Sequence, residues 1–190
     1  RILRSTCKWP AGRTMSVPIE KATPTWLGPI RQTAFVVDDI DAAAQQWVDT
    51  HGVGPWFLYD VDIENTSYRG TNVSMRARMG LAQCGEQQIE LIQPNPDTPS
   101  IYNEFLESGG TGVHHVCYWA DIRQAVDHFQ ACGAEVLQSG TTTAGNEFVY
   151  LSGSCGLPYV ELVDPQGAMR EFFDTIERAA TGWDGTQPFR

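Results

Sequence analysis

Two short stretches of the chain repeat one pattern, and this repetition limits the folds that the chain can adopt. Residues 89–94 read Ile-Glu-Leu-Ile-Gln-Pro, and residues 160–165 read Val-Glu-Leu-Val-Asp-Pro. An earlier pair of β-branched, alternating segments, residues 30–37 and 113–120, is in both cases followed by Asp and a helical pattern. Two repeats in the same order predict one structural unit that is written twice.

The hydrophobic periodicity predicts the elements of each unit. The first unit has a helical pattern at 40–48, a polar loop at 65–72, and strand patterns at 30–37, 56–63, 73–83 and 87–93. The second has a helix at 121–132 and strands at 113–120, 135–140, 147–151 and 157–163, and a last helix follows at 169–180. We therefore predict an α+β fold in which two tandem βαβββ modules form a cupped mixed sheet with helices on the outside.

The predicted boundaries follow from these elements. We expect an N-terminal arm at 1–28, a first module at 29–96, a linker with a short helix at 97–111, a second module at 112–174 and a tail at 175–190. Residues 1–14 carry four basic residues and no acidic one. We expect them to be a cloning remnant or sequence upstream of a true start at Met15, with an Arg-rich transit peptide as the second alternative.

Composition excludes several classes of partner. The 190 residues carry a formal net charge of -10, which argues against a nucleic-acid backbone as ligand. No apolar run approaches the roughly 18 residues that a membrane helix needs. The five Cys are widely spaced and form no CxxC pair, which favours free thiols in a reducing, cytoplasmic environment over a disulfide framework. We expect a small-molecule ligand.

Strand geometry places the polar residues of the repeated strands on one face. Side chains alternate along a strand, so Glu90 and Glu161 point away from the aliphatic neighbours that cover each module's helix. By the same alternation, Gln32 and His115 point away from the helix-facing side of the two first strands. If the two free faces enclose a trough, the four side chains converge inside it.

Such a group has the composition of a metal site. Two carboxylates inside a fold are costly unless something neutralises their charge. A divalent cation would do so, and the mixed N/O donors suit Zn, Ni, Co, Mn or Fe. Water at the remaining positions would make the site catalytic and not structural.

These residues resemble a known family. The repeated βαβββ unit, the run Gly112-Val113-His114-His115 that leads to Asp121, and the two strands with Glu-Leu resemble the vicinal oxygen chelate superfamily over roughly residues 28–174. That superfamily includes glyoxalase I, methylmalonyl-CoA epimerase, extradiol dioxygenases and fosfomycin or bleomycin resistance proteins. Its metal ligands lie on the first and last strand of each module, and this implies the ligand set Gln32, Glu90, His115 and Glu161. The order of these ligands resembles eukaryotic glyoxalase I, whereas the Gly-rich joint before His114 resembles the epimerases.

The resemblance implies a metal-dependent lyase or isomerase of the glyoxalase I-like type. It would shift a proton next to a carbonyl held by the metal, through an enediolate or enolate, with Glu161 as the catalytic base and Glu90 as its catalytic partner. The alternatives are an acyl-CoA epimerase, a non-catalytic small-molecule binding or resistance protein, and an extradiol-type dioxygenase. Gln32 disfavours the last, because those oxygenases use two His and one carboxylate. The resemblance is compatible with a homodimer.

Four further residues are candidates for substrate binding. Arg76 and Arg78 share one face of a strand and could hold an anionic substrate group, although a solvated edge explains them equally well. Trp56 and Trp119 could line the pocket, although aromatic residues more often fill a core. Strand alternation turns His114 away from the trough, and a structural role is expected for it.

Overall fold

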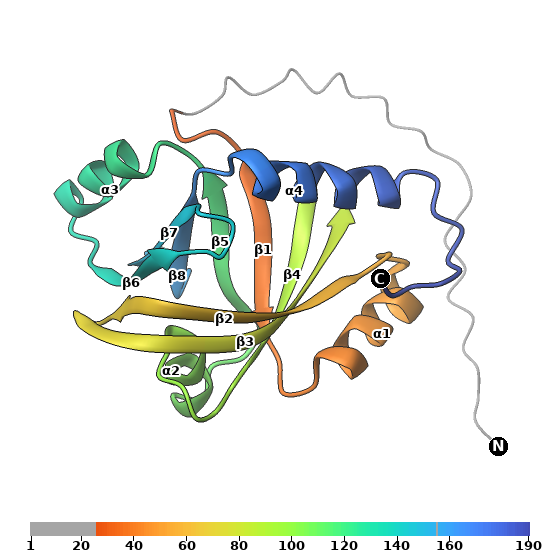
Figure 1. Cartoon of the computed structure of the whole chain (residues 1–190), viewed down its shortest axis with the longest axis horizontal. Helices are drawn as coiled ribbons and strands as arrows, with labels where there is room; N and C mark the ends of the chain where they lie inside the picture. Colours follow the sequence, from red (N-terminus) through yellow and green to blue (C-terminus); the bar gives the residue numbers. More distant parts are fainter. Residues whose placement is uncertain (1–25, 155) are drawn as a thin grey trace.

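The computed structural model describes residues 26–154 and 156–190 (Figure 1). The expectations for residues 1–14 and for Met15 lie outside this range, as do Cys7 and Cys155. The three cysteines that the structure describes, Cys84, Cys117 and Cys132, are free thiols.

The first module follows the predicted order of elements. The Asp39 carboxylate caps α1 by accepting a hydrogen bond from the backbone N–H of Ala42, and Gly52 ends the helix in a left-handed conformation with φ of 66°. The elements are β1 (Ile30–Val36), α1 (Ile40–His51), β2 (Phe57–Tyr68), β3 (Thr71–Cys84) and β4 (Gln87–Pro94).

The second module repeats this order after a linking helix, and a last helix follows it. Asp121 caps α3 as Asp39 caps α1, by accepting from the backbone N–H of Gln124. The elements are α2 (Ile101–Glu107), β5 (Val113–Trp119), α3 (Ile122–Ala131), β6 (Val136–Thr141), β7 (Glu147–Ser152), β8 (Tyr159–Val163) and α4 (Gly167–Ala180). The predicted α+β class with two tandem βαβββ modules is confirmed.

The eight strands form a mixed sheet that closes on itself, in the order β1-β4-β3-β2-β6-β7-β8-β5. The pairs β1/β4 and β5/β8 are parallel, and the others are antiparallel. Closure depends on the far end of β2, where Ser67 and Tyr68 pair with β6. The polar loop predicted at 65–72 is therefore wrong, because β2 continues to Tyr68 and only Arg69 and Gly70 form the turn.

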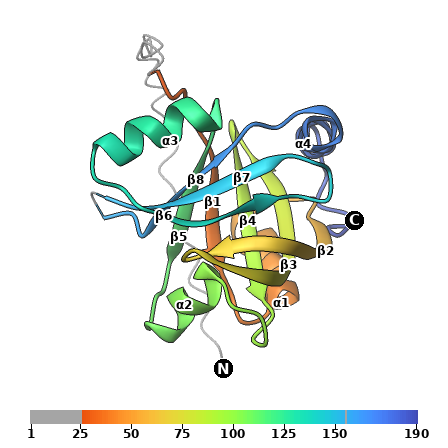
Figure 2. The same ribbon diagram turned by 60° about the vertical axis from the view of Figure 1, so that its left-hand side comes forward.

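Helices cover the barrel on its outside and at its two ends. Helix α1 packs outside β3 and β4, and α3 packs outside β7 and β8. Helix α2 contributes Ile101, Tyr102 and Phe105 to the interior, whereas α4 packs through Phe173 and Ile176 against Leu81. Figure 2 shows α2 and α4 at opposite ends of the barrel. None of the described helices is long and apolar enough to cross a bilayer.

Candidate metal centre

The register of β1 brings the polar residues of the two modules together. This strand lies between β4 and β5, and Ala34 is the register partner of Glu90 on one side and His115 on the other. On the next strand, Glu161 of β8 is the partner of Cys117 of β5. Paired residues point to the same face of a sheet, so these side chains share the barrel interior.

Three of these side chains converge on one point. The Nε2 atom of His115 lies 3.3 Å from Oε2 of Glu90 and 3.3 Å from Oε2 of Glu161. The potential ligand atoms of the three residues lie within 4.8 Å of one another. His115 is 0% exposed, Glu90 6% and Glu161 8%, so bulk water screens the charges of this group only weakly.

The residues present fit a divalent cation. Glu90 Oε2 and His115 Nε2 are buried, and neither has a hydrogen-bond partner among the described residues, although they lie in contact. Buried polar atoms are ordinarily paired, and a cation bound by both would satisfy them together. Two carboxylates and one imidazole form a donor set that suits Zn, Mn, Fe, Co or Ni. The triad could therefore bind such an ion.

His114 orients the imidazole of His115. The Nε2 atom of His114 lies 3.4 Å from the carbonyl oxygen of Ile101, which can only accept, so this nitrogen carries the proton. The Nδ1 atom of His114 is then free to accept from Nδ1 of His115, at 2.9 Å. This arrangement leaves the lone pair of His115 Nε2 directed at the two carboxylates, as metal coordination requires. Burial, together with the neighbouring His115, lowers the pKa of His114 well below its usual value and keeps it neutral.

The pKa shifts of the cluster show where a proton is held when no cation is bound. Burial lowers the pKa of His115, but Glu161 and Glu90 outweigh this effect and raise the pKa to about 9. Burial raises the pKa of Glu90. Burial acts on Glu161 in the same sense, but His115 and Tyr150 outweigh it and lower the pKa of Glu161. In the metal-free protein, a proton on the imidazole thus supplies the positive charge that the carboxylates attract.

Gln32 lies beside this cluster. Its amide nitrogen donates to Oε1 of Gln88 at 2.8 Å, which fixes the orientation of the amide. Both residues are buried, and Gln32 borders the cavity that Glu90 and Glu161 also line. The Gln32 oxygen is not used in this hydrogen bond and is a candidate ligand.

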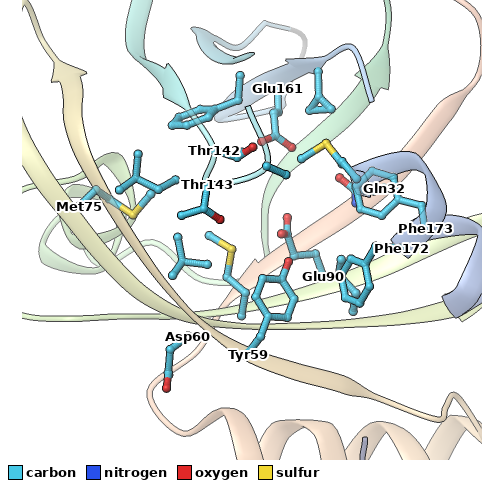
Figure 3. A pocket seen from close by; sticks show the side chains of 18 of the residues that line it. Gln32, Tyr59, Asp60, Met75, Glu90, Thr142, Thr143, Glu161, Phe172 and Phe173 are labelled. Atoms are coloured by element: carbon cyan, nitrogen blue, oxygen red, sulfur yellow. The ribbon is translucent and has the colours of Figure 1, made fainter. Parts of the chain in front are cut away.

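The cluster lies in the wall of a cavity of about 310 Å³ inside the barrel. Figure 3 shows Glu90 and Glu161 directed into it, with Tyr59 beside Glu90 and Phe172 and Phe173 of α4 at its edge. Burial and the charges of Glu90 and Glu161 raise the pKa of Tyr59 well above its usual value, so its hydroxyl stays protonated. The site can therefore offer a neutral hydroxyl donor as well as carboxylates.

The four candidate substrate-binding residues lie away from this cavity. Arg76 pairs with Asp62 at 3.1 Å, and Arg78 pairs with Asp41 on α1. Trp56 is fully buried in the core beneath α1, and its indole nitrogen donates to the carbonyl of Val53. Trp119 stacks on Phe173 and borders a separate polar hollow. Neither arginine and neither tryptophan is among the residues that line the cavity.

Sequence reasoning did not identify several residues of the site. For His114 the sequence predicts only a structural role, because strand alternation turns its side chain away from the cavity. Alternation gives no sign that the Nδ1 atom of His114 contacts Nδ1 of its neighbour His115. Met169 and Phe172 of α4 and residues 142–144 line the cavity. For α4 a signal existed, since the spacing of Met169, Phe172, Phe173 and Ile176 forms an apolar helix face that another element must cover.

Comparisons with known proteins agree with this architecture. The model of the family described as Glyoxalase/Bleomycin resistance protein/Dioxygenase superfamily matches residues 31–151. The ethylmalonyl-CoA/methylmalonyl-CoA epimerase of Cereibacter sphaeroides is 28% identical over 120 residues, which make up 63% of this chain and 81% of that protein.

A solved structure shows the same fold, and a second one is reported beside it. Methylmalonyl-CoA epimerase from Mycobacterium tuberculosis superposes with a TM-score of 0.54 and 16% identity, covering 80% of this chain and 97% of its own. A variant of the Streptomyces coelicolor methylmalonyl-CoA epimerase, in complex with 2-nitronate-propionyl-CoA, has a TM-score of 0.48 and 21% identity, with coverages of 72% and 94%.

Proposed function

Because the chain belongs to the glyoxalase/bleomycin resistance protein/dioxygenase superfamily and gathers two carboxylates around one imidazole, we propose that it is a metal-dependent isomerase of the epimerase type. It would remove the proton from a carbon next to a carbonyl and return a proton to the opposite face of that carbon. Of the chemistries predicted from sequence, the similarity to the Cereibacter sphaeroides epimerase favours this one over a glyoxalase I-like reaction.

The observation that carries the proposal is that Glu90 and Glu161 lie together at Nε2 of His115. Each contacts the same Nε2 atom at 3.3 Å, and the two carboxylates come from different modules. An epimerase needs one group that takes a proton from one face of the carbon and another that delivers a proton to the opposite face. In our proposal, Glu161 removes the proton and Glu90 returns one, and the roles exchange for the other epimer.

Gln32, Glu90, His115 and Glu161 would hold the cation. When bound, the cation supplies a Lewis acid that draws electron density from the substrate carbonyl and so acidifies the neighbouring C–H bond. Each carboxylate has two oxygens, so one can act as a ligand while the other faces the reacting carbon. The Tyr59 hydroxyl lines the cavity next to Glu90 and can donate a hydrogen bond to a substrate oxygen. The surrounding apolar walls exclude water, which would compete for the transferred proton.

The name of the Cereibacter sphaeroides relative suggests an acyl-CoA thioester as substrate. A thioester carbonyl acidifies its α-carbon, and the CoA part would remain outside the barrel. We place the entrance of the cavity at three exposed residues that also line it, namely Asp60, Thr143 and Ala168.

Deuterium uptake at the α-carbon tests the proposal. The protein is stripped with a chelator, reloaded with Zn, Co or Mn, and incubated in D₂O with a single epimer of a 2-methylacyl-CoA thioester, and exchange is followed by NMR. We expect exchange only with metal, and a loss of about 10²- to 10⁴-fold in Glu161→Gln and in Glu90→Gln. Glu147→Gln, which changes an exposed carboxylate of β7, is the matched control.

Two outcomes would contradict this function. Exchange that survives both the chelator and the two substitutions would mean that the cluster has no part in the reaction. Binding of metal and thioester with no exchange for any thioester tested would favour a non-catalytic binding protein.

A further inference from the structure

The walls of the cavity differ sharply from its polar end. Away from Glu90 and Glu161, the lining consists mainly of aliphatic, thioether and aromatic side chains, among them Val61, Ile63, Met75, Met79, Leu81 and Phe148. They come from β2, β3 and β7, and Met169 and Phe172 of α4 extend the same surface. An apolar surface of this kind binds apolar groups, because contact with them removes both surfaces from water.

The cavity also lacks a positive side chain. Of the described residues that line it, none is Lys, Arg or His, and the charged ones are Glu90, Glu161 and Asp60. The carboxylate of Asp60 lies at the exposed edge, and Figure 3 shows it directed away from the other lining residues. The arginines of β3 cannot compensate, since Arg76 and Arg78 are on the outer surface and are engaged with Asp62 and Asp41.

From these two observations, we propose that the part of the substrate that enters the barrel is a bulky, uncharged apolar group attached to the reacting carbon. A branched, alicyclic or aryl group meets this description. A free carboxylate beyond the reach of the cation would lie against an apolar wall with no counter-charge, and such burial is strongly unfavourable. This substrate class rests on the proposed function, because it presupposes that the carbonyl lies at the cluster.

The size of the cavity supports the same class. About 310 Å³ lies within the range of pockets that bind small organic ligands, and it far exceeds the space that a methyl branch occupies. Met75 and Met79 form part of the wall, and their flexible thioethers adapt to bulky ligands of irregular shape. A substrate with only a small substituent would leave much of this surface in contact with water.

A matched pair of fluorescent probes tests the proposal without any catalytic step. N-phenyl-1-naphthylamine is neutral, whereas 8-anilino-1-naphthalenesulfonate has the same aromatic body and one negative charge. We measure saturation of the neutral probe with metal-loaded protein, and its displacement by the sulfonate. We expect the neutral probe to bind and the sulfonate to compete at least about tenfold more weakly, because its charge would lie without a counter-charge against the apolar side chains of the wall.

A charge introduced into the wall should reverse this preference. Val61 is half-buried and lines the cavity, so Val61→Arg can keep its guanidinium near the entrance while its stem stays in the wall. We expect this variant to bind the neutral probe more weakly and the sulfonate more tightly. Val136→Arg, on the exposed surface of β6, should change neither.

The inference is overturned if the sulfonate binds the wild type as tightly as the neutral probe does, if the neutral probe does not bind, or if Val61→Arg leaves both affinities unchanged. Its failure is separable from failure of the proposed function. Exchange without preference for the neutral probe removes the substrate class alone, and selective binding of the neutral probe without exchange removes the isomerase alone.

Discussion

The two modules differ in the residue that precedes the inward-facing side chain of the first strand. In the first module Arg31 precedes Gln32, and in the second module His114 precedes His115. Arg31 is half-buried, and its guanidinium lies 4.9 Å from the centre of the Trp119 ring, outside the cavity. His114 is fully buried and is hydrogen-bonded to His115. The two strands follow one pattern, but the residues that precede Gln32 and His115 make different contacts.

The linking helix accounts for this difference. Helix α2 provides the carbonyl of Ile101 that accepts from His114, and its Tyr102 and Phe105 rings pack against the His114 imidazole. Gln32 of the first module instead donates to Gln88 on the neighbouring strand. We infer that the second module provides the more rigid half of the candidate centre, because His115 is held by a chain of hydrogen bonds that begins at helix α2.

The largest effect should follow removal of the second-module imidazole. We expect His115→Ala to lower the affinity for Zn or Co by more than about 100-fold. Loss of a residue that only orients a metal ligand lowers the metal affinity by about 10- to 100-fold, and loss of the ligand itself should lower it further. Titration against a chromophoric chelator measures the affinity. His51→Ala, exposed at the end of α1, should leave it unchanged. An unaltered affinity in His115→Ala would remove this residue from the ligand set.

Replacement of His114 should have the next largest effect on metal affinity. We expect His114→Phe to weaken metal binding by about 10- to 100-fold, because His115 loses the partner that sets its tautomer. The new ring remains among Tyr102, Phe105 and Tyr159, so the fold should persist in far-ultraviolet circular dichroism. The corresponding first-module variant, Arg31→Leu, should bind metal as the wild type does. Equal losses in both variants would contradict the asymmetry between the modules.

Gln32 should matter more for stability than for metal binding. In Gln32→Leu the buried amide of Gln88 loses its partner, which we expect to cost about 1–3 kcal/mol in the free energy of unfolding. The loss of metal affinity should be smaller than in His114→Phe. Urea denaturation of the metal-free protein measures the stability. The double variant Gln32→Leu/Gln88→Leu should regain part of it, because no buried amide is then left unpaired.

The smallest effect concerns Glu104 of α2, which connects the two modules. Its carboxylate accepts hydrogen bonds from Tyr68 at 2.8 Å and Arg69 at 2.8 Å on the first module, and from Tyr159 at 3.3 Å on the second. Arg69 is the main cause of the lowered pKa of Glu104, and Tyr68 acts in the same direction against the effect of burial.

A carboxyl group whose pKa is lowered by folding stabilises the protein above its unfolded value, and this contribution is lost as the pH falls through the folded value. We therefore expect Glu104→Gln to lower the free energy of unfolding at pH 7 by about 1 kcal/mol or less, since solvent screens a pair whose side chains are 49% and 28% exposed. The difference from wild type should shrink below the ordinary Glu pKa and disappear as the pH falls through the lowered pKa of folded Glu104. Glu107→Gln, exposed on the same helix, is the control, and a difference that persists in acid would exclude this explanation.

The parts of the fold that repeat could be predicted from the sequence. Ile89 and Leu91 face α1 while Glu90 faces inward, and Val160 and Leu162 face α3 while Glu161 faces inward, as strand alternation predicts. The start of a helix after an Asp also followed from local signals, and Asp39 and Asp121 cap α1 and α3. These features depend on neighbours in the chain, which a single sequence displays.

Features set by distant contacts could not be predicted. Residues 65–68 look like a loop because they are polar, yet pairing of Ser67 and Tyr68 with β6 extends the strand. The side of the sheet on which an aromatic residue lies is also not readable from the sequence. For Trp56 the sequence left a pocket wall and a core position open, and the residue packs beneath α1. The contact between His114 and His115 depends on ring orientations that α2 sets from outside the strand.

The closure of the sheet has a consequence for how the protein is made. The first module alone would end in two unpaired strand edges, because β1 awaits β5 and β2 awaits β6. While the ribosome is still synthesising the second module, Glu90 has neither an enclosing wall nor a histidine beside it. The cluster of Glu90, His115 and Glu161 can therefore form only after the second module has been synthesised, because β5 and β6 of that module pair with both free edges.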